Sequence, residues 1–153
     1  MTNLSQLDFG SPSLIWERIG PSLVKEGSNE RGALAAYLPT PDVCVVRGRG
    51  HLSLDLTRIV IDVLDPHIAK GHLVALYYDY EHMTSYDAEG RHLVTNWGIA
   101  NRKSLRTIDI LIGGSRFVAM GVAAASLAMK VIRLPMRIHS KRSEFESILL
   151  GTI

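Results

Sequence analysis

From residue 33 onward, apolar residues follow strand-like and helix-like spacing in turn, and this pattern predicts the order of the elements. Short apolar runs at 33–38 and 42–50, separated by a proline-containing turn, predict a β-hairpin. Residues 52–71 carry apolar positions three and four apart, which is typical of a helix with one buried face. Pro66 is expected to kink or end this helix, and Gly71 to stop it.

The remainder of the chain alternates strands and helices. Nearly continuous apolar runs predict buried strands at 72–80 and 107–112, and helical spacing predicts helices at 87–104, 115–129 and 141–150. Residues 130–139 predict an edge strand, with Ile132 and Ile138 on the buried face and Arg137 and His139 toward water. The order ββαβαβαβα indicates an α/β sandwich around a mixed sheet of about five strands.

Residues 1–32 lack this regularity and are interpreted as an N-terminal extension, with a single domain over 33–153. Within the extension, residues 13–27 fit a short amphipathic helix that Gly20-Pro21 would interrupt.

Composition narrows the class of protein without naming a function. Hydrophobic residues make up 46% and charged residues 21%, which is ordinary for a globular domain. The net charge of +2 gives no reason to expect a nucleic-acid partner. The longest apolar run, 117–129, is shorter than a membrane span, and the N-terminus lacks a signal-peptide pattern, so a cytoplasmic protein is expected. Cys44, the single cysteine, is expected to be a buried thiol.

One local pattern carries the family resemblance. Asp79 ends a predicted strand, and eight residues later Asp87-Ala88-Glu89-Gly90 begins a predicted helix. Together with the order of elements over 33 to about 145, this resembles the STAS family, and in particular its stand-alone SpoIIAA-like members, which are often grouped with Sec14-type lipid-binding proteins. The resemblance implies a non-enzymatic regulatory module whose partner contacts Asp79, Asp87, Ala88, Glu89 and Gly90.

The same pattern departs from the family at the residue that matters for regulation. The resemblance places a phosphorylatable serine where this chain has Ala88, which has no hydroxyl. Glu89 next to it carries a fixed charge that cannot be removed as a phosphate can. Partner binding is therefore expected to be constitutive. The alternative is that these residues only begin a helix, with Asp87 as its cap and Glu89 favourable to its dipole.

The helix predicted at 115–129 has small or apolar residues on nearly every side, so it is poorly suited to face water. It could be buried within the monomer, pair with a second subunit in a homodimer, or border a groove for a small apolar or lipid-like ligand. For the last alternative, the pocket residues are predicted to be Tyr77, Trp97, Phe117 and Met120.

Further candidate sites are weaker. Gly113, Gly114 and Ser115 precede a helix and could receive an anion or simply form a tight turn. Asp79, Glu81, His82 and His92 carry ligand-type side chains without a metal-site spacing, so no metal is predicted. No catalytic residues and no cofactor are identified. An enzyme with an unrecognised site stays open as the third hypothesis, after the interaction module and the apolar-ligand carrier or sensor.

Overall fold

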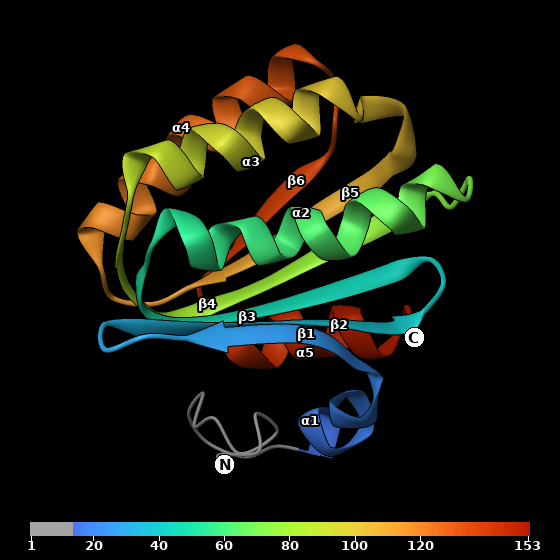
Figure 1. Cartoon of the computed structure of the whole chain (residues 1–153), viewed down its shortest axis with the longest axis horizontal. Helices are drawn as coiled ribbons and strands as arrows, with labels where there is room; N and C mark the ends of the chain where they lie inside the picture. Colours follow the sequence, from blue (N-terminus) through green and yellow to red (C-terminus); the bar gives the residue numbers. More distant parts are fainter. Residues whose placement is uncertain (1–13) are drawn as a thin grey trace.

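A six-stranded mixed sheet separates two layers of helices in the computed structural model, which describes residues 14–153. The strands are β1 (Leu23–Ser28), β2 (Gly32–Thr40), β3 (Val43–Leu52), β4 (Val74–Tyr86), β5 (Leu105–Ile112) and β6 (Met136–His139). Helices α2 (Leu54–Ala69), α3 (Ala88–Ala100) and α4 (Arg116–Val131) cover one face, and α1 (Leu14–Ile19) and α5 (Arg142–Leu150) cover the other (Figure 1).

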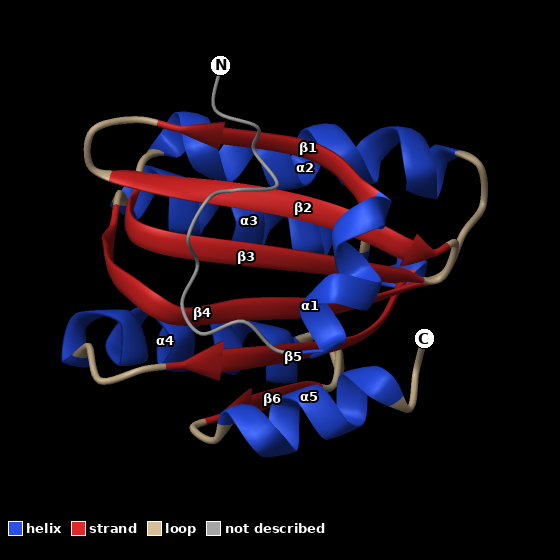
Figure 2. Ribbon diagram, turned by 90° about the horizontal axis from the view of Figure 1, so that it is seen from below, coloured by secondary structure: helices blue, strands red, loops and turns tan. Residues whose placement is uncertain are grey.

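The strands lie in the sheet in chain order, as Figure 2 shows from the α1 and α5 side. The strands β1, β2 and β3 form an antiparallel meander, whereas β3 to β6 run parallel and are joined by α2, α3 and α4. The α/β class and the mixed sheet are therefore confirmed, with six strands in place of about five. The additional strand is β1, and it lies within the residues interpreted as an extension.

The first helix of the parallel half begins and ends much as its sequence predicts, except at its proline. The hydroxyl of Ser53 caps α2 by accepting from the N–H of Leu56, and Gly71 after its end has a φ of 91°. Pro66 lies within the helix and does not end it. The helix continues for only three further residues, to Ala69, so the missing N–H removes one hydrogen bond close to a terminus.

The segment after Asp79, expected to be a loop, is strand. The strand β4 continues to Tyr86, pairing with β5 as far as Tyr80 and with β3 as far as Tyr86. The reason is tertiary: β3 also extends to Leu52 and supplies hydrogen-bond partners for backbone groups that would otherwise face water.

The edge strand is also corrected. It covers only Met136–His139, and its expected wet face is covered, because α5 packs there. The side chain of His139 is therefore buried and Ile138 is partly exposed, the reverse of the prediction for these two residues, whereas Arg137 is exposed as predicted.

Each face of the sheet has its own apolar core, and the buried thiol of Cys44 belongs to the core under α2, α3 and α4. Burial raises the pKa of that thiol to about 12, so it is protonated at neutral pH, as expected of a structural cysteine. Within residues 14–153 no helix is long and apolar enough to span a membrane.

Candidate functional site

The carboxyl ends of β3 and β4 bring together three polar side chains that are far apart in the sequence or carry no shared motif: His51, Ser85 and Asp87. Nδ1 of His51 lies 2.7 Å from Oγ of Ser85, and Nε2 of His51 lies 2.9 Å from Oδ1 of Asp87. Neighbouring parallel strands end at the same edge of a sheet, which is where α/β proteins most often bind ligands. Recognising that 42–50 and 72–80 would pair in parallel would have predicted this cluster.

Asp87 serves a different helix from the one expected. Its side chain makes no capping hydrogen bond to α3; instead Oδ2 accepts from the N–H of Leu54, the first residue of α2, at 3.0 Å. The hydrogen bond from Leu54 and, next, that from His51 lower the pKa of Asp87 below its usual range. Asp87 thus joins the ends of β3 and β4 to the start of α2. Both ring nitrogens of the buried His51 make a hydrogen bond, one to Ser85 and one to Asp87. These Ser–His–Asp contacts hold the end of β3 against the end of β4.

Gly90, in the first turn of α3, lies where this helix packs against α2. A Cβ on Gly90 would lie 3.0 Å from Oγ1 of Thr57, so the glycine permits the close packing of α3 on α2. Glu89 is exposed in the first turn, where a negative charge is favourable. Ala88 presents no hydroxyl at this position.

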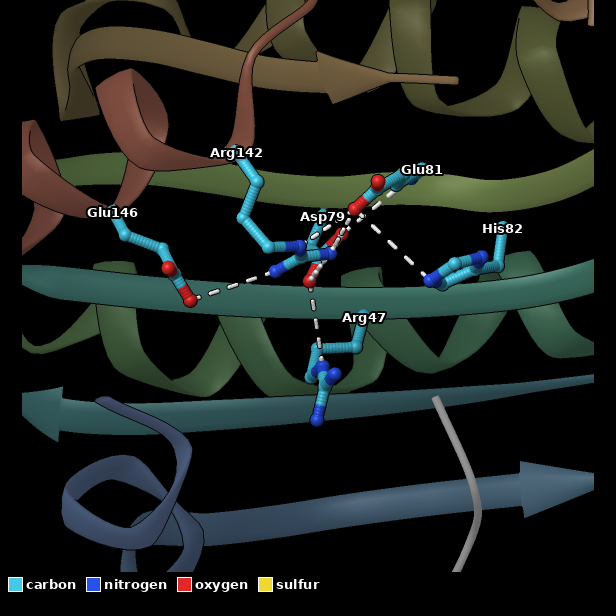
Figure 3. A network of polar contacts seen from close by, with 6 residues as sticks. All are labelled: Arg47, Asp79, Glu81, His82, Arg142 and Glu146. Atoms are coloured by element: carbon cyan, nitrogen blue, oxygen red, sulfur yellow. Dashed lines mark hydrogen bonds and ion pairs between the residues drawn. The ribbon is translucent and has the colours of Figure 1, made fainter. Parts of the chain in front are cut away.

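Asp79 belongs to a separate buried cluster on the other face of the sheet, the Asp79 network (Figure 3). Both carboxylate oxygens of Asp79 accept from Nη2 of Arg142, at 2.9 and 3.0 Å, and Oδ2 lies 3.5 Å from Nε of Arg47. Glu81 accepts from Nε of Arg142 at 2.6 Å, and Glu146 lies on its other side. Burial alone would lower the pKa of Arg142, but Asp79 and Glu81 outweigh it and raise that pKa.

The Asp79 network joins α5 to the sheet, and it makes no contact with Asp87. The seven residues between the two aspartates lie along β4, and a strand rises about 3.3 Å per residue, so the carboxylates are roughly 20 Å apart or more. The five residues predicted to contact a partner are therefore divided: Asp87, Ala88, Glu89 and Gly90 lie together, and Asp79 lies elsewhere.

The metal-type residues do not gather either. His82 lies 4.0 Å from Glu81 at the margin of the Asp79 network, while His92 is on α3, on the opposite face. Among residues 14–153 no three histidine, cysteine, aspartate or glutamate side chains are placed to hold a metal ion.

The glycine turn before α4 is closely packed. A Cβ on Gly113 would lie 2.0 Å from the carbonyl oxygen of Glu81. The hydroxyl of Ser115 donates to the carbonyl of Thr84 at 3.1 Å and accepts from the N–H of Val118 at 3.3 Å, so it caps α4. This contact with β4 accounts for Gly113 and Ser115, whereas Gly114 faces open space.

The four residues predicted to line a ligand pocket do not lie together in the structure. Trp97 lines a cavity beneath α3 and α4. Tyr77 points to the other face, where its hydroxyl lies 2.7 Å from that of Thr152. Phe117 stacks on Tyr86 but is half exposed, and Met120 is more exposed still. Helical phase decides this, because 117 and 120 fall on the outer side of α4.

The cavity has a volume of about 120 Å³ and lies between the sheet, α3 and α4; we call it the apolar cavity. Its walls include Tyr78, Tyr80 and Ile108 from the sheet and Trp97 and Met129 from the helices. Of the residues predicted from sequence, only Trp97 and Gly90 contribute to it.

The outer side of α4 exposes a continuous apolar row, which we call the α4 stripe: Phe117, Met120, Ala124, Leu127 and Val131. The four large side chains are 52%, 71%, 65% and 83% exposed, respectively, and Ala124 is also exposed. Residues 14–153 therefore leave this side of the helix uncovered, which argues against the first of the three alternatives, complete burial, within the part of the chain that the structure describes.

The order of the strands and the placement of the helices define an α/β fold. The chain is similar in structure to an uncharacterised DUF3478-family protein from Shewanella loihica PV-4, described as having a SpoIIAA-like fold. The TM-score is 0.57 at 13% sequence identity, over 80% of this chain and 98% of that one. No protein-family model and no curated protein matches the sequence. The predicted SpoIIAA-like fold is thus confirmed.

Proposed function

We propose that this chain is a non-enzymatic STAS-type interaction module that works as a homodimer built on α4. The observation that carries the proposal is the α4 stripe. Soluble monomers rarely expose an apolar row of this length, and such rows usually mark contact with another macromolecule. The stripe residues are separated by three and four positions in turn, the spacing with which one helix packs along another.

The symmetry of the stripe favours a second copy as its occupant. Ala124 stands at the centre, with an apolar side chain three or four and seven residues away in each direction. In an antiparallel pair around Ala124, Phe117 would lie beside Val131 of the second copy, and Met120 close to Leu127. A two-fold dimer needs such a self-complementary surface, and the small side chain at the axis lets the two helices approach.

Charge gives the dimer a recognisable signature. Arg116 and Lys130 flank the two ends of the stripe, and antiparallel pairing would bring Arg116 near Lys130 of the second copy. Like charges repel, and salt screens exposed charges over about 10 Å at 0.1 M. Dimerisation is therefore expected to strengthen as salt is added.

Sedimentation velocity over a concentration series tests the proposal. The wild-type protein should dimerise, and Leu127→Glu should be monomeric, because it places a charge inside the contact. Leu73→Glu is the matched control: Leu73 is 45% exposed, lies just before β4 and is not part of the α4 stripe, so this variant should dimerise as the wild type does. A wild-type monomer at all concentrations, or a dimer that survives Leu127→Glu, contradicts the proposal.

Lys130→Glu tests the antiparallel arrangement itself. It replaces two repulsive contacts with two attractive ones, so the variant should dimerise more tightly than the wild type. Its dimer should weaken with added salt, the opposite of the wild-type trend.

The start of α3 is the second surface of the proposed module. Asp87, Ala88, Glu89 and Gly90 correspond to the residues that meet the partner in the STAS antagonists this chain resembles. Because Ala88 cannot be phosphorylated, binding there would be constitutive, and Glu89→Lys would weaken it without unfolding the protein.

A second candidate function is the carriage or sensing of a small apolar ligand, and the apolar cavity supports it. Its volume is about 120 Å³ and its walls are mostly apolar. A ligand that fills it would take apolar surface out of water, which is favourable. The protein would then melt at a higher temperature when the ligand is added.

A further inference from the structure

The apolar cavity exists because α3 stands away from the sheet. This helix packs against α2 and α4 more closely than against any strand, and its two buried residues are both glycines, Gly90 and Gly98 (Figure 1). Its larger apolar side chains are only partly buried, so they line the apolar cavity without filling it.

One residue in this wall is charged. Arg91 of α3 lines the apolar cavity, and its Nε is buried without a hydrogen-bond partner among residues 14–153. The same part of the chain offers Arg91 no ion pair, whereas Arg142 has three carboxylates around it. A buried guanidinium N–H without an acceptor costs free energy, and a carboxylate is the acceptor that matches its geometry.

Two tyrosines add neutral hydrogen-bond donors to the same wall. Tyr78 and Tyr80 line the apolar cavity, and neither hydroxyl has a hydrogen-bond partner within the described residues. Burial raises the pKa of both, so they stay protonated at neutral pH and can donate. The wall thus combines an apolar surface, phenolic donors and one cation.

From this combination we infer that the apolar cavity binds a small monocarboxylic acid, with its hydrocarbon part inside and its carboxylate on Arg91. The inference rests on the second candidate function and names its ligand class. A cavity of about 120 Å³ holds a body of roughly six carbon atoms, since an engineered cavity of about 150 Å³ accepts benzene. Hexanoate and benzoate fit this description.

Isothermal titration calorimetry with butanoate, hexanoate and octanoate, each matched by the alcohol of equal length, tests the inference. Hexanoate should bind about tenfold or more tightly than hexan-1-ol, because only the acid forms a charge-assisted hydrogen bond. In Arg91→Met, which keeps an apolar stem, hexanoate should fall to the affinity of hexan-1-ol.

Filling the apolar cavity supplies the control for location. Ala125 of α4 lines it, so Ala125→Leu should remove binding of both acid and alcohol while the protein stays folded. Gly98→Ala is the second filling variant, since its Cβ would meet Met129 at 3.5 Å, an ordinary contact distance. The two should weaken hexanoate binding in order of added volume.

The outcomes separate the inference from the candidate function beneath it. Equal binding of acid and alcohol, unchanged by Arg91→Met, keeps the apolar-ligand carrier and overturns the carboxylate. Binding that survives both filling variants places the ligand outside the cavity and overturns the inference. No binding of either series overturns the inference and the carrier function together.

Discussion

At the scale of single residues, the sequence pattern at 87–90 has a different cause from the one that its spacing indicates. Asp87 stands where a helix cap is expected, yet its carboxylate holds Leu54 and His51, and so serves α2 and β3. The acidic residue is still necessary, because it accepts hydrogen bonds at both oxygens. What the sequence could not predict is which backbone N–H would be nearest, since that depends on how β3 and β4 pair.

Replacing Asp87 tests this role through its pH dependence. Because its pKa is lower in the folded protein than its ordinary value of 3.8, its contribution to stability is complete above about pH 5 and is lost as the pH falls through the lowered value. Asp87→Asn removes the charge and should therefore be less stable than the wild type at neutral pH.

The difference between the two proteins, measured by urea denaturation, should be constant at neutral pH and shrink as the pH falls below the ordinary pKa of 3.8. A difference that does not change with pH would show that the charge on Asp87 is not what fastens α2.

At the scale of elements, local signals succeed where the element makes its own hydrogen bonds. Ser115 and the apolar spacing after it correctly predict α4, since capping and helical phase are properties of the segment itself. Strand β1 and the second half of β4 were missed because their partners, β2 and β3, decide them. The strand β1 is an exposed edge of mixed polarity, so it has no periodicity to recognise.

Two helical glycines, one in α3 and one in α4, should change stability in opposite directions when each is replaced by alanine. A Cβ on Gly121 of α4 would lie 2.2 Å from the hydroxyl oxygen and 2.5 Å from the ring of Tyr86, which is stacked on Phe117. Overpacking costs about 1–3 kcal/mol, more than the gain of about 1 kcal/mol from alanine's helix propensity. Gly121→Ala should therefore lower stability. Gly98→Ala, which meets only an ordinary contact, should raise it by up to about 1 kcal/mol.

Chemical denaturation of both variants decides between close packing and intrinsic propensity. Tyr86→Leu in the Gly121→Ala background should recover part of the loss, because it removes the ring that the new Cβ meets. If both glycine variants are stabilised equally, Tyr86 moves aside at no cost and the close approach has no structural importance.

At the scale of the whole molecule, the two faces of the sheet have different chemistry. The face under α2, α3 and α4 is apolar and incompletely filled, whereas the face under α1 and α5 contains buried ion pairs. Asp109 is fully buried there and holds both Arg137 and His139. Sequence patterns predicted the sheet because burial leaves a periodic trace. They could not predict these pairs, since each joins residues about 30 to 60 positions apart.

The Asp79 network predicts how the whole molecule responds when one cation is removed. Asp79 is 3% exposed and Arg142 is 22% exposed, so Arg142→Met leaves a buried carboxylate with Arg47 as its remaining arginine contact. Loss of one partner from a buried pair costs about 3–5 kcal/mol, and the partial exposure of Arg142 places the expected loss of stability near the lower end.

Because Arg142 begins α5, hydrogen exchange should show the largest loss of protection in Arg142–Leu150, with a smaller loss in α2. Arg106→Met, at an exposed position of β5, is the matched control and should leave both helices protected. Equal loss in α5 and α2 would mean that the Asp79 network supports the entire fold and not the attachment of one helix.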